Sequence, residues 1–599
     1  MALAGALAVL PASAGAATIG SDGWGMSGTL QTNHVNRFNR DGVPSTCPNP
    51  ITKVPTQTTG PESLAYRSRL WKSYIEQAAC VTASITTACS GGDAIMSETY
   101  SPSYDPSAIT SHWIGDLGDH PPDQTAYSFT VPGGAQFETV VDEVSSTANC
   151  PGVNVTWTSD RPWANLEPIV RGVAAVGREI RTNQDVWQGD PAVSEQWLRC
   201  DAAGSGCAAI PGATDLAYVP TDADIGHALA LRESATENGL TSTAFSRATR
   251  PVIIPAIVRD DSLAAGDASM TQKLAPTNTP STCDTPKAAP GATGFNQLHL
   301  YDAIPITSLI NEPLCVSVQH GFDCFLSLTT VYSPSFAPAQ IQQNYVADDG
   351  LSGALSYTLA AGATSVAVHS DTSGLNQCTH YTMVVGSMAP FATASPALGG
   401  PAVEGLPETT TNGEWGGSPS FRQSWLRCDG DGNACEPIAG ASGASYTPKA
   451  ADVGHRLRSR ITATQVNTSS ADSAPSAVIA PDSTPPRGTI ALARTNLKRV
   501  LKRGFIPVAA TCDENCTVKV SAVVSKKAAN RLGKRRRIAS GSGSARPGTR
   551  SKLRVKLTRR ARRSLRKRQL VRFQLVATFT DARGNAAGVR KKAALKRKR

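Results

Sequence analysis

The sequence predicts an all-β protein built from tandem β-sandwich domains. Short runs of alternating apolar and polar residues, such as "AYSFTV" at 126–131 and "LSYTLA" at 355–360, are separated by Gly, Pro and Asp. That alternation is typical of antiparallel strands with one buried face. The same segments also occur twice along the chain. A length of 599 residues is suited to about four to six domains.

Residues 1–16, "MALAGALAVLPASAGA", are apolar and end in small residues that fit an A-x-A cleavage site. We therefore expect a signal peptide here, although a buried strand would have the same composition. No later stretch approaches the roughly 18 apolar residues of a membrane helix, so no integral membrane span is expected. The 14 cysteines are an even number, which with export favours disulfides over metal binding. Their spacings do not suit zinc, and the expected location is extracellular or the cell surface.

A two-part unit is duplicated. Pro44–Cys47 recurs as Pro280–Cys283 at an offset of 236 residues, and Trp197 recurs as Trp425 at an offset of 228. Between them the offset only falls, as small deletions in a duplicated unit would produce. The intermediate matches are Cys80 with Cys315, Cys89 with Cys324, Tyr100–Ile109 with Tyr332–Ile341, and Cys150 with Cys378.

The first part of each unit, residues 20–160 and 256–389, is predicted to be a β-sandwich. Four cysteines allow three connectivities, so the pairing stays open at this level. We expect a hairpin disulfide and a second disulfide that joins the two ends of the domain. The expected pairs are Cys80–Cys89 and Cys47–Cys150 in the first copy, and Cys315–Cys324 and Cys283–Cys378 in the second.

The second part, residues 165–253 and 392–481, contains "WLRC" followed by a second cysteine seven residues later. This spacing predicts the hairpin disulfides Cys200–Cys207 and Cys428–Cys435. Downstream, "YVPTDADIGHAL" (218–229) and "YTPKAADVGHRL" (446–457) share the pattern D-x-G-H. A Trp in a central strand is typical of immunoglobulin-like sandwiches, where it is buried against the opposite sheet.

These segments resemble a bacterial Ig-like repeat of secreted proteins. The resemblance implies an Ig-like fold, although antibody domains place their disulfide between the sheets rather than in one hairpin. The first part of each unit more loosely resembles the jelly-roll-like pre-peptidase C-terminal sandwiches. The residues that carry the Ig-like resemblance are Trp197, Cys200, Cys207, Tyr218, Asp224, Gly226 and His227, with Trp425, Cys428, Cys435, Tyr446, Asp452, Gly454 and His455.

Residues 484–590 are predicted to be a fifth, basic domain, followed by a disordered tail at 591–599. Strands flank a Cys512–Cys516 turn, "KKAANRLG" (526–533) and "RRARRSLRK" (559–567) predict short helices, and "DARGN" (581–585) predicts a turn. The ending resembles the closing hairpin of Ig-like domains that terminate exported proteins, which implies a sandwich.

Charge is divided unevenly along the chain. Residues 1–480 contain 23 Lys and Arg residues and 43 Asp and Glu residues. Residues 481–599 contain 35 Lys and Arg residues and 4 Asp and Glu residues, which gives this segment a net charge of +31. Such a field attracts anionic polymers, and outside a cell these are envelope polymers or acidic polysaccharides. A surface that is merely soluble would have the same composition. The candidate polyanion-binding residues are Arg535, Arg536, Arg537, Arg559, Arg560, Arg562, Arg563, Arg566, Lys567 and Arg568.

Catalytic signatures such as His-Glu-x-x-His, Gly-x-Ser-x-Gly and the phosphate-binding Gly-Lys-Ser/Thr loop are absent from the sequence. Asp116, Asp348 and Asp349 recur in Gly-containing loops, where they would either bind calcium or form turns. His227 and His455 are expected to cap turn carbonyls. The recurring aromatic residues Tyr100, Tyr104, Trp113, Tyr332, Phe336 and Tyr345 either stack on sugars or fill the cores.

These patterns together predict a non-enzymatic adhesion or scaffold protein, secreted or held at the cell surface. No organic cofactor is expected. The sandwich loops are candidate contacts for other proteins, and the basic domain is the candidate contact with an anionic envelope polymer or polysaccharide. A carbohydrate-binding accessory protein of a secreted hydrolase system is the alternative function. An enzyme of unrecognised type would need a cavity with converging acidic or His side chains.

Overall fold

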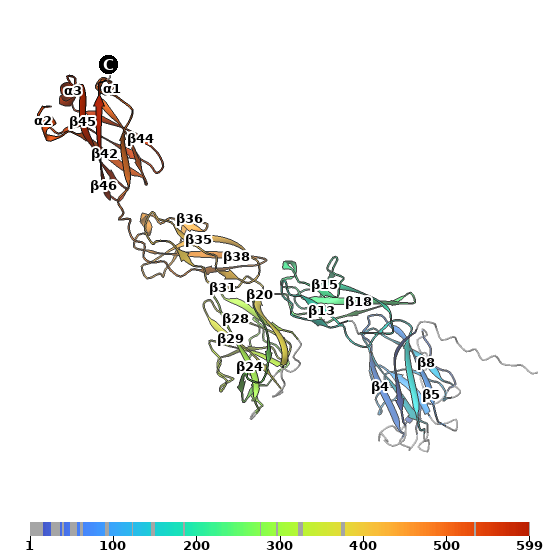
Figure 1. The fold of residues 1–599 in the computed structure, drawn as a ribbon. Helices are drawn as coiled ribbons and strands as arrows, with labels where there is room; N and C mark the ends of the chain where they lie inside the picture. Colours follow the sequence, from blue (N-terminus) through green and yellow to red (C-terminus); the bar gives the residue numbers. More distant parts are fainter. Residues whose placement is uncertain are drawn as a thin grey trace, which may run out of the picture. The chain divides into compact units, whose positions relative to one another are not determined.

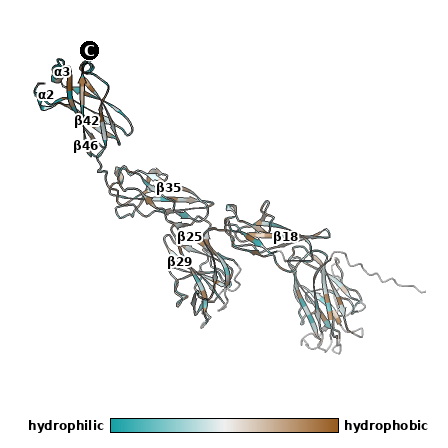
Figure 2. Cartoon of the chain, viewed as in Figure 1, coloured by the Kyte–Doolittle hydropathy of each residue, from teal (hydrophilic) through white to brown (hydrophobic). Residues whose placement is uncertain are grey.

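The protein is almost entirely β-structure. In the computed structural model, strands account for 51% and helices for 5% of the described residues, which confirms the predicted fold class (Figure 1). Brown and teal residues alternate along the strands in Figure 2, as expected for sheets with one buried face. The signal-peptide prediction falls almost wholly outside the described residues. These are 16–25, 36–38, 41–47, 57–59, 64–89, 95–121, 124–144, 150–183, 186–275, 277–294, 297–321, 327–372, 378–531 and 535–597.

The first sandwich contains two four-stranded sheets packed around Phe129, Phe137 and Trp157. Each sheet mixes strands from both halves of the domain, which is the crossed connectivity of a jelly roll. A short ribbon pairs β2 (Asn36–Phe38) with β3 (Gln57–Thr59). One sheet has the order β1 (Ala17–Trp24), β10 (Val153–Ser159), β5 (Ala79–Thr87), β8 (Ala126–Val131), and the other β4 (Tyr66–Lys72), β9 (Gln136–Glu143), β6 (Ile95–Tyr100), β7 (Trp113–Asp116).

The second sandwich repeats this strand order and adds one edge strand, which confirms the duplicated architecture. β22 (Lys273–Leu274) and β23 (Ala292–Thr293) pair separately. The first sheet has the order β20 (Ile254–Leu263), β30 (Cys378–Ser387), β25 (Leu314–His320), β28 (Ala354–Leu359). The second has the order β21 (Ala268–Met270), β24 (His299–Thr307), β29 (Thr364–Asp371), β26 (Ser327–Tyr332), β27 (Tyr345–Asp348).

The predicted disulfides of the sandwiches are wrong. Cys47 pairs with Cys80 and Cys89 with Cys150, so the expected Cys80–Cys89 and Cys47–Cys150 bonds do not form. The reason is that residues 79–87 are one extended strand rather than a hairpin. Nine residues at about 3.3 Å each separate the two cysteines by about 30 Å.

Strand pairing brings the observed partners together. Gly152, two residues after Cys150, accepts a backbone hydrogen bond from Ala88, next to Cys89. In the second sandwich Cys283 pairs with Cys315, which excludes the expected Cys283–Cys378 and Cys315–Cys324 bonds. Cys378 is also disulfide-bonded, whereas Cys324 lies outside the described residues.

Residues 165–253 and 392–481, here called the first and second WLRC modules, also share one topology. Their hairpin disulfides Cys200–Cys207 and Cys428–Cys435 are confirmed. β11 (Trp163–Ala164), just before the first module, pairs with β14 (Trp187–Gln188). The first module also has a three-stranded sheet in the order β12 (Val170–Arg171), β13 (Ile180–Thr182), β17 (Ala217–Tyr218). Its four-stranded sheet has the order β16 (Ala208–Ala209), β15 (Ala192–Arg199), β18 (Leu229–Glu237), β19 (Leu240–Phe245). In the second module β31 (Ala392–Ala394) pairs with β34 (Glu414–Trp415). A three-stranded sheet has the order β32 (Leu398–Gly399), β33 (Glu408–Thr410), β37 (Ser445–Tyr446). A four-stranded sheet has the order β36 (Glu436–Ser442), β35 (Ser420–Cys428), β38 (Arg456–Thr464), β39 (Thr468–Asp472).

Each sandwich shares its core with the WLRC module that follows it. Trp187 and Ala244 of the first module pack in the core of the first sandwich, and Ala392 and Ala471 of the second module pack in the core of the second sandwich. The predicted boundaries near residues 160 and 390 therefore cross continuous cores. The chain divides instead into two compact units, one of residues 1–397, 411–423 and 460–473, and one of residues 398–410, 424–459 and 474–599.

The same backbone contact joins sandwich and module in both copies. The Glu76 amide donates to the Thr243 carbonyl at 2.8 Å, and its counterpart Asn311 donates to Ser470 at 2.8 Å. A repeated hydrogen bond beside a repeated shared core shows that the duplicated element is the sandwich together with its module.

The terminal domain, residues 484–599, has a hydrophobic core of its own that lies entirely between Ile490 and Leu595. It forms one seven-stranded sheet whose edge strands β40 and β46 approach each other, and the Cys512–Cys516 disulfide is confirmed. The sheet has the order β40 (Gly488–Leu492), β41 (Phe505–Cys512), β44 (Ser551–Leu557), β43 (Arg537–Ala545), β42 (Cys516–Val523), β45 (Leu570–Thr580), β46 (Ala586–Lys596), with helices α1 (Leu497–Arg503), α2 (Lys526–Arg531) and α3 (Arg559–Leu565).

The tail prediction is wrong for residues 591–596. Strand β46 continues to Lys596 and pairs with β45 along its whole length. Leu595 is 1% exposed and lies opposite Val571. Burial of this leucine and the strand hydrogen bonds order a segment whose charge alone suggested disorder.

Candidate functional site

The residues shared by the two WLRC modules form a buried framework. Trp197 is fully buried, donates its indole N–H to the Asp215 carbonyl at 2.9 Å, and stacks on Tyr218. Trp425 is also fully buried and donates to the Gly443 carbonyl at 3.0 Å. The repeated tryptophans are therefore core residues and do not form a binding surface.

The Arg of WLRC and the Asp of D-x-G-H form an ion pair in both modules. Asp224 is fully buried and accepts from the Arg199 guanidinium at 2.6 Å and from the Tyr218 hydroxyl at 2.8 Å. Arg427 contacts the buried Asp452 at 2.6 Å. The 25-residue spacing of each pair is visible in the sequence, but only the fold shows that the two residues meet.

The histidines of D-x-G-H cap a turn, as predicted. The Nδ1 atom of His227 lies 2.9 Å from the Cys200 carbonyl, and that of His455 lies 3.0 Å from the Cys428 carbonyl. Each ring therefore connects the D-x-G-H corner to the strand that ends in the first cysteine of the hairpin disulfide.

Replacing Asp224 by Ala is expected to destabilise the first WLRC module by about 2–4 kcal/mol, because the Arg199 guanidinium and the Tyr218 hydroxyl lose their buried acceptor. Chemical unfolding of the full chain measures this loss. Asp215→Ala, which removes an exposed carboxylate of the same module, is the control and should change the free energy of unfolding by less than about 0.5 kcal/mol. Equal effects of the two substitutions would contradict a framework role for Asp224.

The aspartates predicted to bind calcium contact protein groups. Asp348 accepts from the Lys287 ammonium at 2.8 Å and from the Tyr345 hydroxyl at 2.5 Å, and Asp349 lies 2.8 Å from the His320 ring. A Lys charge at this distance already neutralises Asp348 and disfavours a second cation. These contacts provide protein partners for the carboxylates of both aspartates, so their burial is explained without a bound calcium ion.

Asp116 occupies the position in the first sandwich that corresponds to Asp348. Its amide donates to the Ser45 hydroxyl at 3.0 Å, as the Asp348 amide does to Ser281. The repeated P-S-T-C and Asp-containing loops therefore hold each other in both copies. Burial raises the pKa of the neighbouring Glu98, and the charges of Asp142 and Asp116 raise it further.

The repeated aromatic residues fill small cores on the outer faces of the sandwiches. Tyr100 is 1% exposed and Tyr332 is 2% exposed. Tyr104 and Trp113 pack with Tyr100, and Phe336 and Tyr345 pack in the corresponding cluster of the second copy. Since Tyr100 and Tyr332 are covered, they do not offer a platform on which sugars could stack.

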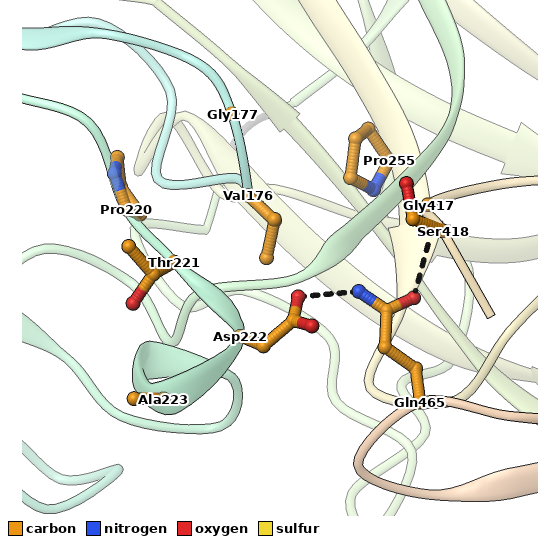
Figure 3. Close-up of a pocket in the computed structure, with 10 residues that line it drawn as sticks. All are labelled: Val176, Gly177, Pro220, Thr221, Asp222, Ala223, Pro255, Gly417, Ser418 and Gln465. Carbon is orange, nitrogen blue, oxygen red and sulfur yellow. Dashed lines mark hydrogen bonds between the residues drawn. The ribbon is translucent and has the colours of Figure 1, made fainter. Parts of the chain in front are cut away.

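A pocket of about 740 Å³ lies within the first compact unit (Figure 3). The Gln465 side chain crosses it, accepting from the Ser418 amide at 3.2 Å and donating to the Asp222 carboxylate. Asp222 is the one charged side chain among its described lining residues, which are Val176, Gly177, Pro220, Thr221, Asp222, Ala223, Pro255, Gly417, Ser418 and Gln465.

The terminal domain contains the main charged surface. Its helices bury one face, with Val500 of α1 and Leu565 of α3 in the core, and place their cations outward. Alternation along the strands exposes further cations outside the predicted set. These are Lys552, Arg554 and Lys556 on β44 and Arg590, Lys592 and Lys596 on β46.

Two of the predicted polyanion-binding residues donate to backbone carbonyls. The Arg562 guanidinium donates to the Leu501 carbonyl at 3.1 Å and so caps the C-terminal end of α1. Arg536 donates to the Val524 carbonyl at 3.4 Å. The remaining members are solvent-exposed or partly exposed: Arg535, Arg537, Arg559, Arg560, Arg563, Arg566, Lys567 and Arg568.

The four acidic residues after position 480, of which Asp482 lies just before the domain, gather at one end of it. Burial raises the pKa of Glu514, and the charges of Asp581, Asp482 and Asp513 raise it further. The carboxylate oxygens of Asp482, Glu514 and Asp581 lie within 4.8 Å of one another, a grouping that could hold a metal ion. Asp581 also accepts from the Asn585 side chain at 2.8 Å, which explains the D-A-x-G-N pattern.

The acidic end does not neutralise the basic surface. Strand β42 runs from Cys516, beside the acidic turn, to Val523, which lies opposite Arg537. Seven extended residues span about 23 Å, whereas the Debye length at physiological salt is about 8 Å. The cations around Arg537 therefore act on a ligand without screening by the domain's own carboxylates.

Among the described residues, no helix is both long and apolar enough to cross a membrane. The disulfides described above are those of a protein that folds in an oxidising compartment.

Comparison with known proteins gives little further information. No family model and no curated protein matches the chain. Among solved structures, an Antarctic bacterium's Ca²⁺-stabilised adhesin that binds ice is 12% identical, with 70% of this chain and 94% of the other covered and a TM-score of 0.15. A 1.5-MDa bacterial ice-binding adhesin is 12% identical, with 49% and 96% covered and a TM-score of 0.13. The E. coli alpha-2-macroglobulin is 10% identical, with 95% and 40% covered and a TM-score of 0.11. We infer nothing about function from TM-scores this low.

Proposed function

We propose that this is a non-enzymatic adhesion or scaffold protein, secreted or held at the cell surface, whose terminal domain binds anionic polymers of the cell envelope. The observation that carries the proposal is the separation of charge within the terminal domain. The four acidic residues after position 480 gather at one end of the domain, whereas 35 Lys and Arg residues follow the same position. A folded surface that carries mostly positive charge raises the local concentration of a negatively charged polymer.

The duplicated sandwich and WLRC module supports a display role for the rest of the chain. Buried tryptophans, internal ion pairs and disulfides account for the repeated residues. The exposed loops between the strands would then be the surfaces that contact other proteins.

The proposal predicts which part of the chain is retained on purified cell envelopes. Residues 484–599 are expected to bind at low salt and to be released as salt is raised, whereas residues 17–483 are expected to remain in solution. The isolated domain is a suitable reagent because its core is self-contained. A chelator should leave retention unchanged, since the cationic side chains bind an anion without a metal. Salt-resistant retention of residues 17–483 would contradict the proposal and favour sugar binding by the sandwiches.

A further inference from the structure

Three arginines of the terminal domain surround one small pocket. The pocket has a volume of about 290 Å³. Its described lining contains no acidic side chain, and every charged group in it is a guanidinium. The lining residues are Arg535, Arg537, Ile538, Thr558, Arg560 and Ala561.

The fold fixes the two segments that supply these arginines. Arg537 is the first residue of β43 and Arg535 lies two residues before it, while Ile538 is 2% exposed and holds the strand in the core. Arg560 lies on α3, which is fixed by the buried residues Ala561 and Leu565.

A backbone hydrogen bond joins the two segments. The Thr558 amide donates to the Ile538 carbonyl at 3.0 Å, and the Thr558 hydroxyl accepts from the Ala561 amide at 3.1 Å. The segments that carry Arg537 and Arg560 are therefore both anchored in the core, and Arg535 precedes the first of these segments by two residues.

Like charges held together repel unless an anion lies between them. Each guanidinium is planar and donates in a fork that matches two oxygens of an oxyanion. A carboxylate has two oxygens and is satisfied by one such fork. A tetrahedral phosphate group offers oxygens in several directions and can accept from guanidinium groups on both segments.

We propose that the pocket of Arg535, Arg537 and Arg560 binds a single phosphate group of a phosphate-bearing envelope polymer. This inference rests on the proposed function and makes it more specific. The pocket recognises one phosphate group, while the surrounding cations attract the polymer by charge alone.

The test uses residues 484–599 and inorganic phosphate at constant ionic strength, followed by NMR chemical-shift titration. Arg535→Gln/Arg537→Gln is expected to weaken phosphate binding at least tenfold. The matched control is Arg546→Gln/Arg550→Gln, which removes the same charge from two exposed arginines in the turn between β43 and β44. The control should change the phosphate affinity less than twofold, and the NMR spectra of both variants report whether the fold is retained.

Equal weakening in the two variants, or no measurable phosphate binding by the unmodified domain, would overturn the phosphate pocket. Retention of the unmodified domain on envelopes separates this failure from failure of the proposed function. If the domain is retained and both variants bind phosphate equally, only the pocket is wrong. If the domain is not retained, the proposed function itself fails.

Discussion

Replacing Trp197 by Ala is expected to lower the free energy of unfolding of the first WLRC module by about 3–5 kcal/mol. The Trp197 side chain is fully buried, stacks on Tyr218, and donates to a backbone carbonyl. Its removal leaves a cavity and an unpaired Asp215 carbonyl in a small core. Calorimetry of the full chain measures the effect as a lower melting temperature of the transition that includes this module.

Val193→Ala is the control, because Val193 lies on the same strand and is 40% exposed. It should change the free energy of unfolding by less than about 0.5 kcal/mol. Trp425→Ala should produce a loss similar to that of Trp197→Ala. If Trp197→Ala melts like the unmodified protein, Trp197 is not a core residue and the repeated motif needs a different explanation.

The second sandwich is expected to lose stability in mild acid, whereas the first is not. Its core contains His369, which is fully buried with Nδ1 3.0 Å from the Thr329 hydroxyl. The ring of His320, which contacts the Asp349 carboxylate, lies 4.9 Å from the His369 ring, and the ring of Tyr381 lies 4.3 Å from the His369 ring. The register places Ile85, Val141 and Val153 of the first sandwich at the positions of His320, His369 and Tyr381.

The direction of the effect follows from the pKa of His369. Burial lowers this pKa well below its ordinary value, and the neighbouring His320 lowers it further. Below about pH 6.5 the unfolded chain binds a proton that the folded core does not bind. Stability is therefore complete above that pH and falls by about 1.4 kcal/mol per pH unit below it, until the folded-state pKa is reached.

Calorimetric scans between about pH 7.5 and 5 measure the loss, with His369→Val as the matched variant because the first sandwich has Val141 at the same place. The variant should remove much of the pH dependence. An unchanged pH dependence in His369→Val would mean that another group is responsible. Equal acid sensitivity of the two sandwiches would contradict the assignment to this core.

The strands, the duplication and helices α2 and α3 were predictable because each depends on local patterns, whereas helix α1 (Leu497–Arg503) was not predicted. The alternation of apolar and polar residues at 126–131 predicted strand β8, and the segment "KKAANRLG" predicted helix α2. The sandwich disulfides were not predictable, because they depend on which strands become neighbours. Cys80 and Cys89 are close in sequence, but Cys80 lies near the start of β5 and Cys89 lies two residues after its end. Cys89 and Cys150 meet only because β5 pairs with β10.

The candidate site was predictable in composition but not in geometry. The excess of Arg and Lys after residue 480 identified the basic domain, but the sequence could not separate Arg562, which caps α1, from Arg560, which lines a pocket. The sequence also concealed the gathering of Asp482, Glu514 and Asp581, because these residues are separated by up to 99 positions. Such groupings arise from strand order, which depends on packing across the whole domain.

The most direct test of the central claim is the salt dependence of the affinity of residues 484–599 for a defined linear polyphosphate. We predict that the logarithm of the affinity falls linearly with the logarithm of salt concentration. The loss should be at least about 100-fold between about 50 and 200 mM salt, as expected when several bound cations are released from the polymer. An affinity that does not change over this range would show that charge does not hold the domain to its ligand, and it would contradict the anchoring role proposed here.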